Sequence, residues 1–168
     1  MLIAVSRSRL RLLPADWKTA AIAVAISIAG VTALIVLLDC AVFRNHLPPS
    51  YVAFYTGPLM PRTLVLCLLA IAEEIRFRLL LMTVLALAAA ALWRRTPPPW
   101  CFLLIIITAQ FANVGASVLQ DPTYATFRYL AVGGVWGWLY WRYGWVSALI
   151  GHATTHLLLD PLLFLGLR

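Results

Sequence analysis

Two adjacent carboxylates, Glu73 and Glu74, lie in the middle of an apolar run that is long enough to cross a lipid bilayer. Arg78 follows them in the same run. On a helix, Glu74 and Arg78 share one face, so the guanidinium can neutralise that carboxylate, whereas Glu73 projects about 100° away and is left free. Ionisable groups inside a membrane segment are costly and usually functional. The unpaired second acid therefore favours chemistry over a purely structural ion pair.

The composition places this run in an integral membrane protein. Hydrophobic residues make up 63% of the chain and charged residues 11%, and the mean hydropathy is +0.91, outside the range of a soluble domain of 168 residues. The net charge of +7 does not indicate nucleic-acid binding, because the basic residues are scattered beside apolar runs, as topology signals are. The three cysteines lie in apolar segments without paired spacing, so we expect no disulfide.

Apolar segments separated by turn signals predict an all-α, polytopic transmembrane bundle of about five spans, folded as a single domain over residues 1–168. The predicted spans are 19–43, 63–93, 100–119, 127–140 and 145–165. The second would be about 46 Å long as one helix, so it must tilt, bend or project beyond the membrane. The stretch 44–62, rich in proline and aromatic residues, predicts an interfacial loop with no span of its own.

The basic residues predict the orientation of these spans. With the N-terminus in the cytoplasm, most basic residues fall on the cytoplasmic side and few lie opposite. The cytoplasmic set comprises the basic N-terminal segment 1–18, Arg94, Arg95 and Arg142, and the opposite set is mainly Arg44, Arg62 and Arg168. The reverse orientation fits far worse, so we expect a cytoplasmic N-terminus.

A second group of polar residues lies in the last predicted span. His152, His156 and Asp160 follow one another at intervals of four residues and so share one face of an otherwise apolar helix. Two histidines on one face indicate a site more than a packing contact. Asp160 is the weakest member, because Pro161 follows it and a place at the membrane surface would account for it.

Other polar and aromatic residues are explained more simply. Gln110 and Asn113, in the third span, are expected to form interhelical hydrogen bonds when they are considered alone. The aromatic cluster 136–145 is typical of an interface belt.

Taken together, these residues resemble a known family. The segment 73–78 matches the pattern EExxxR, and the run 137–156 resembles the small and aromatic residues that lead into the last-motif histidine of the CPBP intramembrane proteases. These are bacterial relatives of the type II CAAX prenyl endopeptidases and are also called abortive infection proteins. The resemblance covers a family-like core of about 64–160. It implies an all-helical membrane fold with a polar cavity, in which a glutamate and a histidine activate water for peptide hydrolysis.

The resemblance also implies roles for individual residues. Glu73 would be the general base, Glu74 and Arg78 a supporting pair, and His152 the histidine that polarises the scissile carbonyl or holds the oxyanion. The expected partners are the lipid bilayer and a membrane-associated peptide or protein substrate, without nucleic acid. The expected location is the bacterial inner membrane, with a multi-pass topology.

Two positions depart from the family pattern. The second motif is FxxxH, but this chain has no histidine between His46 and His152. Counted from the glutamates, Asn113 best matches that place, although Phe111 with Gly115 gives the literal FxxxG frame. The last motif usually carries Asn or Asp four residues after its histidine, where this chain has His156. We therefore hypothesise an exchange, in which His156 supplies the missing imidazole and Asn113 supplies the amide. The alternative is a noncatalytic member that acts as a membrane binding or immunity protein.

Metal binding and transport are further alternatives. Glu73, His152 and His156 have the residue types of a three-ligand zinc site with an open water position. The resemblance implies a metal-free glutamate mechanism more strongly, so we expect no obligatory cofactor and keep zinc as the alternative. A transporter with Glu73 and the histidines as a proton relay is disfavoured, because the sequence shows no inverted repeat.

Overall fold

The computed structural model describes residues 10–94 and 96–168, so the predictions on Arg7, Arg9 and Arg95 lie outside the described residues. Within the described part, the regular elements are all helical, and the predicted all-α bundle is confirmed. The elements are α2 (Trp17–Leu37), η1 (Leu38–Val42), η2 (Arg44–His46), α3 (Pro49–Thr56), α4 (Leu59–Glu73), η3 (Glu74–Met82), α5 (Thr83–Trp93), α6 (Pro99–Gln120), α7 (Pro122–Ala125), η4 (Thr126–Ala131), α8 (Val132–Tyr143) and α9 (Trp145–Gly166).

Among the described residues, four helices are long and apolar enough to cross a membrane, against the five spans predicted from the sequence. The four are Trp17–Val42, Leu59–Trp93, Pro99–Gln120 and Trp145–Gly166. The remaining predicted span, 127–140, lies in the helical run of α7, η4 and α8, but Arg128 and several tyrosines and tryptophans make this run more polar. Neighbouring helices bury the polar residues of this run, since Arg128 is buried and Trp136 is fully buried.

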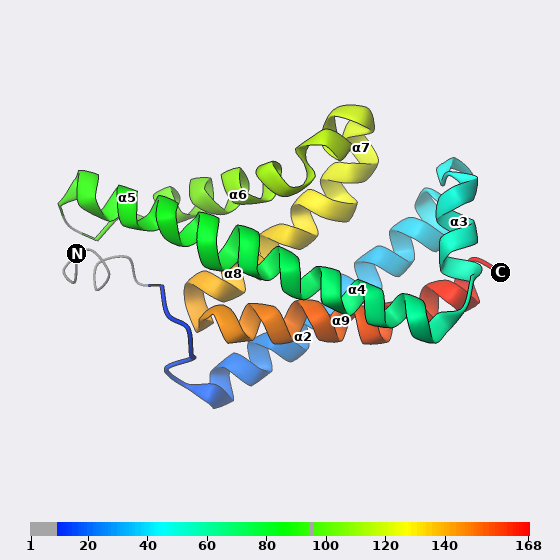
Figure 1. The fold of residues 1–168 in the computed structure, drawn as a ribbon, viewed down its shortest axis with the longest axis horizontal. Helices are drawn as coiled ribbons and strands as arrows, with labels where there is room; N and C mark the ends of the chain where they lie inside the picture. Colours follow the sequence, from blue (N-terminus) through cyan, green and yellow to red (C-terminus); the bar gives the residue numbers. More distant parts are fainter. Residues whose placement is uncertain (1–9, 95) are drawn as a thin grey trace.

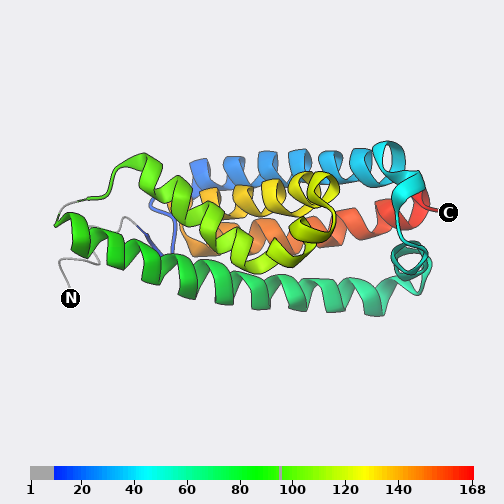
Figure 2. The same ribbon diagram turned by 90° about the horizontal axis from the view of Figure 1, so that it is seen from above.

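Helix α9 is central to the bundle. It packs against α2, α4 and α8, and Figure 2 shows it between α2 and the long helical run of α4, η3 and α5. That run extends over 35 residues along the length of the molecule (Figure 1), longer than a bilayer core requires, as its sequence predicted. α6 packs on η3 and α8. Both polar groups predicted from the sequence, one on α4 and η3 and the other on α9, therefore face each other across a single interface.

Three of the described helical runs contain a π-helical segment, and each of these segments carries a buried charged residue. η1 contains Asp39, η3 contains Glu74 and Arg78, and η4 contains Arg128. A π turn inserts an extra residue and rotates the following part of the helix, and such turns are frequent at functional sites. The side chains after each π segment consequently depart from simple α-helical register.

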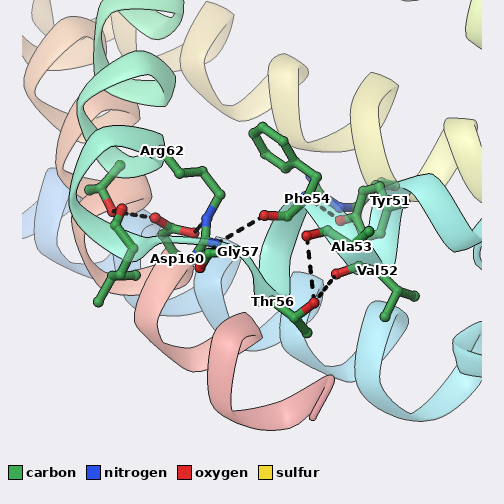
Figure 3. A network of polar contacts seen from close by, with 11 residues as sticks. Tyr51, Val52, Ala53, Phe54, Thr56, Gly57, Arg62 and Asp160 are labelled. Atoms are coloured by element: carbon green, nitrogen blue, oxygen red, sulfur yellow. Dashed lines mark hydrogen bonds and ion pairs between the residues drawn. The ribbon is translucent and has the colours of Figure 1, made fainter.

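The predicted loop 44–62 contains the short helix α3, which lies at one end of the bundle (Figure 1). Arg62 fixes the end of this helix, because its Nη1 donates to the carbonyl oxygens of Phe54 and Gly57 at 2.9 and 2.8 Å (Figure 3). Its Nε donates to Asp160 of α9 at 2.6 Å. Arg62 therefore joins α3 and α4 to the central helix.

This ion pair changes the interpretation of Asp160. The sequence left open a place at the membrane surface, and the structure buries Asp160 together with Arg62. Thr63 also donates to the second carboxylate oxygen of Asp160. A buried carboxylate is tolerated only when it is paired and hydrogen-bonded, and both conditions hold here.

The turn between α8 and α9 depends on Gly144, which has a φ of +97°. After this turn, the N–H groups of Trp145 and Val146 donate to the carbonyl oxygens of Arg11 and Leu12 at 2.9 and 3.0 Å. The segment before α2 thus satisfies two backbone donors in the first turn of α9, which would otherwise lack partners within that helix.

Gly144→Ala should lower stability by about 1–3 kcal/mol, because the new side chain would hold a strained positive φ. Its Cβ would also lie 2.9 Å from the carbonyl carbon of Leu13. Gly134→Ala is the matched control, since Gly134 lies within α8 and a Cβ there would meet nothing within 4 Å. Thermal unfolding in detergent should show a lower Tm for Gly144→Ala alone; equal Tm values for the two variants would contradict this account.

Candidate active site

A cavity of about 200 Å³ lies among the central helices and receives side chains from α4, α6, α8 and α9. Glu73, Asn113, His152 and His156, the four catalytic candidates from the sequence, all line it. The structure therefore brings together residues from three separate predicted spans. Their catalytic roles stay predictions, but the shared cavity is the geometry that those roles require.

Glu73 ends α4 and is half-buried. Its Oε2 accepts a hydrogen bond from Nδ2 of Asn113 at 2.9 Å, and its Oε1 accepts none from a described residue. No described cation forms an ion pair with it. Among the described cavity-lining residues it is the one carboxylate, so it can accept a proton without competition from a neighbouring acid in the lining.

Glu74 begins η3 and is fully buried. Nε of Arg78 lies 3.5 Å from its Oε1, so the pair predicted from the four-residue spacing is present. The same oxygen lies 2.9 Å from Nδ1 of His152. The sequence suggested a partnership of His152 with the site of Glu73, but did not reveal this direct contact with Glu74. The Glu74 carboxylate thereby fixes the orientation of the His152 ring.

Arg78 is held by more than its glutamate. Its Nη2 donates to Oε1 of Gln110 at 2.7 Å and to the carbonyl oxygen of Gly133 at 3.1 Å. Gln110 also donates through Nε2 to the carbonyl oxygen of Tyr129 at 3.1 Å. A Cβ at Gly133 would lie 2.0 Å from the Gln110 amide, so a glycine is needed for this close approach. Gln110 thus has the interhelical role expected for it and also positions the arginine beside the site.

The two histidines of α9 are neighbours, with ring centroids 5.3 Å apart. Nδ1 of His156 is buried and has no hydrogen-bond partner among the described residues. On the other side, the indole of Trp136 stacks on His152 at 5.6 Å and an interplanar angle of 15°. The interface-belt interpretation of cluster 136–145 is therefore wrong for Trp136, which packs against the site. The small residue Gly137 beside it was an available signal of close helix packing.

The zinc alternative can be compared with this arrangement. In the part of the chain that the structure describes, no three His, Cys, Asp or Glu side chains are grouped closely enough to hold a metal ion. Glu73, His152 and His156 line one cavity without converging on a common point. In this arrangement the three side chains do not form a three-ligand group, so the zinc alternative has no geometric support among the described residues.

A second polar network, which the sequence did not predict, adjoins the cavity. Asp39 of η1 accepts hydrogen bonds from Nε of Arg128 at 3.1 Å and from the hydroxyl groups of Tyr51 and Tyr124. Burial raises the pKa of the Tyr51 phenol, so this hydroxyl remains a donor. Arg128 and Tyr51 also line the cavity. The sequence could not reveal this network, because its members are not periodic along any one helix.

Comparison with known proteins supports the resemblance seen in the sequence. A family model described as Type II CAAX prenyl endopeptidase Rce1-like matches residues 56–158. No curated protein and no solved structure matches the chain. The matched segment contains Glu73, Asn113, His152 and His156, whereas Asp39 and Tyr51 precede it.

Proposed function

Because the chain belongs to the type II CAAX prenyl endopeptidase Rce1-like family, we propose that it is an intramembrane peptidase that hydrolyses a membrane-associated peptide or protein with glutamate-activated water. Membership supports a membrane-embedded protease of the CAAX type. The observation that carries the finer proposal is the placement of Glu73. It is a carboxylate without a cationic partner among the described residues, and it shares a cavity with two imidazoles and an amide.

In the proposed reaction, Oε1 of Glu73 accepts a proton from water while the water oxygen attacks the scissile carbonyl carbon. Asn113 holds the other oxygen of Glu73 through Nδ2, which fixes the carboxylate for this transfer. The proton then passes to the amine of the leaving peptide as the C–N bond breaks. A new carboxyl group and a new amino group result, so no redox partner is needed.

His152 is suited to stabilise the oxyanion of the tetrahedral intermediate. Its Nδ1 contacts the buried Glu74 carboxylate, which favours a ring that carries a proton on that nitrogen. In the doubly protonated ring, Nε2 is also a donor and can bind the developing negative charge. The second N–H of Asn113 would provide another donor, and Nε2 of His156, which also lines the cavity, would hold the attacking water.

The noncatalytic alternative is favoured by one specific observation, namely that the family's second-motif histidine is replaced by Asn113. A carboxamide does not take up or release a proton in the physiological range. If His156 does not replace that imidazole, the cavity would bind a peptide without cleaving it. The chain would then be a membrane binding or immunity protein with the same fold.

Peptide cleavage in proteoliposomes tests the proposed function. The purified chain is incubated with a library of membrane-anchored peptides, with Glu73→Gln protein as the blank, and products are identified by mass spectrometry. We expect cleavage of a subset of the peptides, at a rate that a zinc chelator changes by less than about twofold, because the described residues contain no group of three metal ligands. Absence of any cleavage would support the noncatalytic alternative, and a chelator-sensitive rate that zinc restores would support the metal alternative.

A further inference from the structure

A second cavity, of about 210 Å³, adjoins the first. We name it the vestibule; it is lined by the turn after α2, the start of α3, the end of α6 and the start of α7, and it includes Phe43, Ser117 and Tyr124. Tyr51 and Tyr129 line both cavities. The two spaces are therefore neighbours along one continuous lining surface, to which both tyrosines contribute and which we call the shared wall. Figure 1 shows α3 and α7, the helices that border the vestibule, toward the same end of the bundle.

The Asp39 network lies at this shared wall. Arg128 lines the first cavity, Tyr124 lines the vestibule and Tyr51 lines both. Each of these three side chains donates a hydrogen bond to Asp39. Nη2 of Arg128 donates to the Tyr51 hydroxyl at 3.2 Å. Asp39 is fully buried, so its four-residue network is a fixed element of the wall and not a solvated surface pair.

Arg128 retains donor capacity after these contacts. Its Nε and Nη2 are engaged by Asp39 and Tyr51, but Nη1 makes no hydrogen bond to a described residue. Because the other two nitrogens are held, the guanidinium plane is oriented and needs little reorganisation to bind a further acceptor. Asp39 already compensates the charge of Arg128, so the acceptor does not need to be an anion, and a peptide carbonyl oxygen is sufficient.

We infer that Arg128 is a substrate-binding residue, whose Nη1 donates to a backbone carbonyl of a peptide that extends from the catalytic cavity into the vestibule. This inference rests on the proposed function for the identity of the ligand as a peptide. The vestibule would take the part of the chain on one side of the scissile bond, with an apolar or aromatic side chain against Phe43 and Tyr124. These two rings meet edge to face at 5.3 Å and form an apolar surface beside the polar groups of Ser117 and Gln120.

The segment before the family match is therefore part of the substrate site. Asp39, Phe43 and Tyr51 all precede residue 56, where the match begins. Asp39 and Tyr51 orient Arg128, while Phe43 and Tyr51 line the vestibule. The family motifs would supply the catalytic groups, and this N-terminal part would supply selection among peptides.

The chain provides a matched control in its other buried arginine–aspartate pair. Arg62 and Asp160 are as deeply buried as Arg128 and Asp39, and they also secure α3. Arg62, however, lines neither the catalytic cavity nor the vestibule. A general loss of packing around α3 would affect both pairs, whereas loss of a substrate contact would affect only Arg128.

The test compares Arg128→Lys with Arg62→Lys on a library peptide that the native chain cleaves in proteoliposomes. Lysine keeps the charge opposite the aspartate but lacks the planar fork of donors. Arg128→Lys should raise KM about tenfold and change kcat less than about threefold, because a contact made equally in ground and transition states affects binding alone. In the Glu73→Gln background, the Kd of the same peptide, measured by fluorescence anisotropy, should rise by the same factor. Arg62→Lys should lower Tm and leave KM within about twofold.

A second variant, Phe43→Ala, leaves the Asp39–Arg128 pair intact and should also raise KM, most strongly for peptides with a large side chain in the vestibule. If Arg128→Lys does not fold, this variant decides the question. Unchanged KM and Kd in the folded variants, or equal increases for Arg128→Lys and Arg62→Lys, would overturn the inference. If the native chain binds library peptides without cleaving them and Arg128→Lys or Phe43→Ala weakens that binding, the inference stands and the proposed catalysis fails. If no peptide binds, both fail.

Discussion

Glu73→Gln should reduce kcat for peptide cleavage by about 10²- to 10⁴-fold and leave the folded protein intact, because it removes a general base and little else. Glutamine has nearly the same shape and keeps an oxygen that can accept the hydrogen bond from Asn113. No described cation is paired with Glu73, so its neutralisation leaves no charge stranded. The expected change in stability is within about 0.5 kcal/mol.

Glu74→Ala should have the opposite signature. It removes the carboxylate that contacts both Arg78 and His152, and Arg78 would then remain buried with only neutral partners, Gln110 and the carbonyl of Gly133. Stranding one member of a buried pair costs about 3–5 kcal/mol, so the folded yield and Tm should fall strongly. Thermal unfolding in detergent and kcat, measured on both variants, separate the two roles. An equal loss of stability for Glu73→Gln and Glu74→Ala would refute this division.

The sequence predicted the helices well where lipid contact dictates their composition. Apolar runs of membrane-spanning length are an unambiguous signal, and four of the five predicted spans correspond to qualifying helices. The fifth, 127–140, is helical but less apolar than the other four, because a helix that is packed against other helices does not need an entirely apolar surface. Arg128 can lie within such a run when Asp39 neutralises it.

The site was predictable to the extent that it depends on spacing within one helix. Glu74 with Arg78, and His152 with His156, are pairs that helical periodicity brings together, and both pairs are adjacent in the structure. The contact between His152 and Glu74 depends on how two helices are rotated against each other, which the π-helical turn beginning at Glu74 also alters. No local pattern encodes that rotation.

The missed network has a related explanation. Asp39 and Arg128 are 89 residues apart, and each has ordinary surroundings along the chain, one near the end of an apolar run and the other near a turn. A single buried charge in such a segment indicates that a partner exists, but not which residue it is. Asp39 and Arg128 have no oppositely charged neighbour one helical turn away in the sequence, and they find each other only in the folded bundle.

The exchange between the second and last family motifs predicts strong coupling between Asn113 and His156. Asn113→His and His156→Asn should each reduce peptide cleavage, by about 10- to 100-fold, because each change duplicates one group and removes the other. The double variant should restore the usual family arrangement of one imidazole on α6 and one amide on α9. Its kcat should therefore exceed the value expected from adding the two single effects, since groups that act as a unit are not additive.

The structure supports this experiment by placing both residues on the wall of one cavity. Asn113 contacts Glu73, so a histidine there could reach the proposed base, and the buried Nδ1 of His156 has no partner among the described residues that the substitution would leave stranded. Tm values should confirm that all three variants fold. If neither the native chain nor the double variant cleaves any peptide of a membrane-anchored library while Asn113→His alone does, the exchange is wrong. A single histidine beside Glu73 would then be the group that the native chain lacks, and the native chain would be a noncatalytic member of its family.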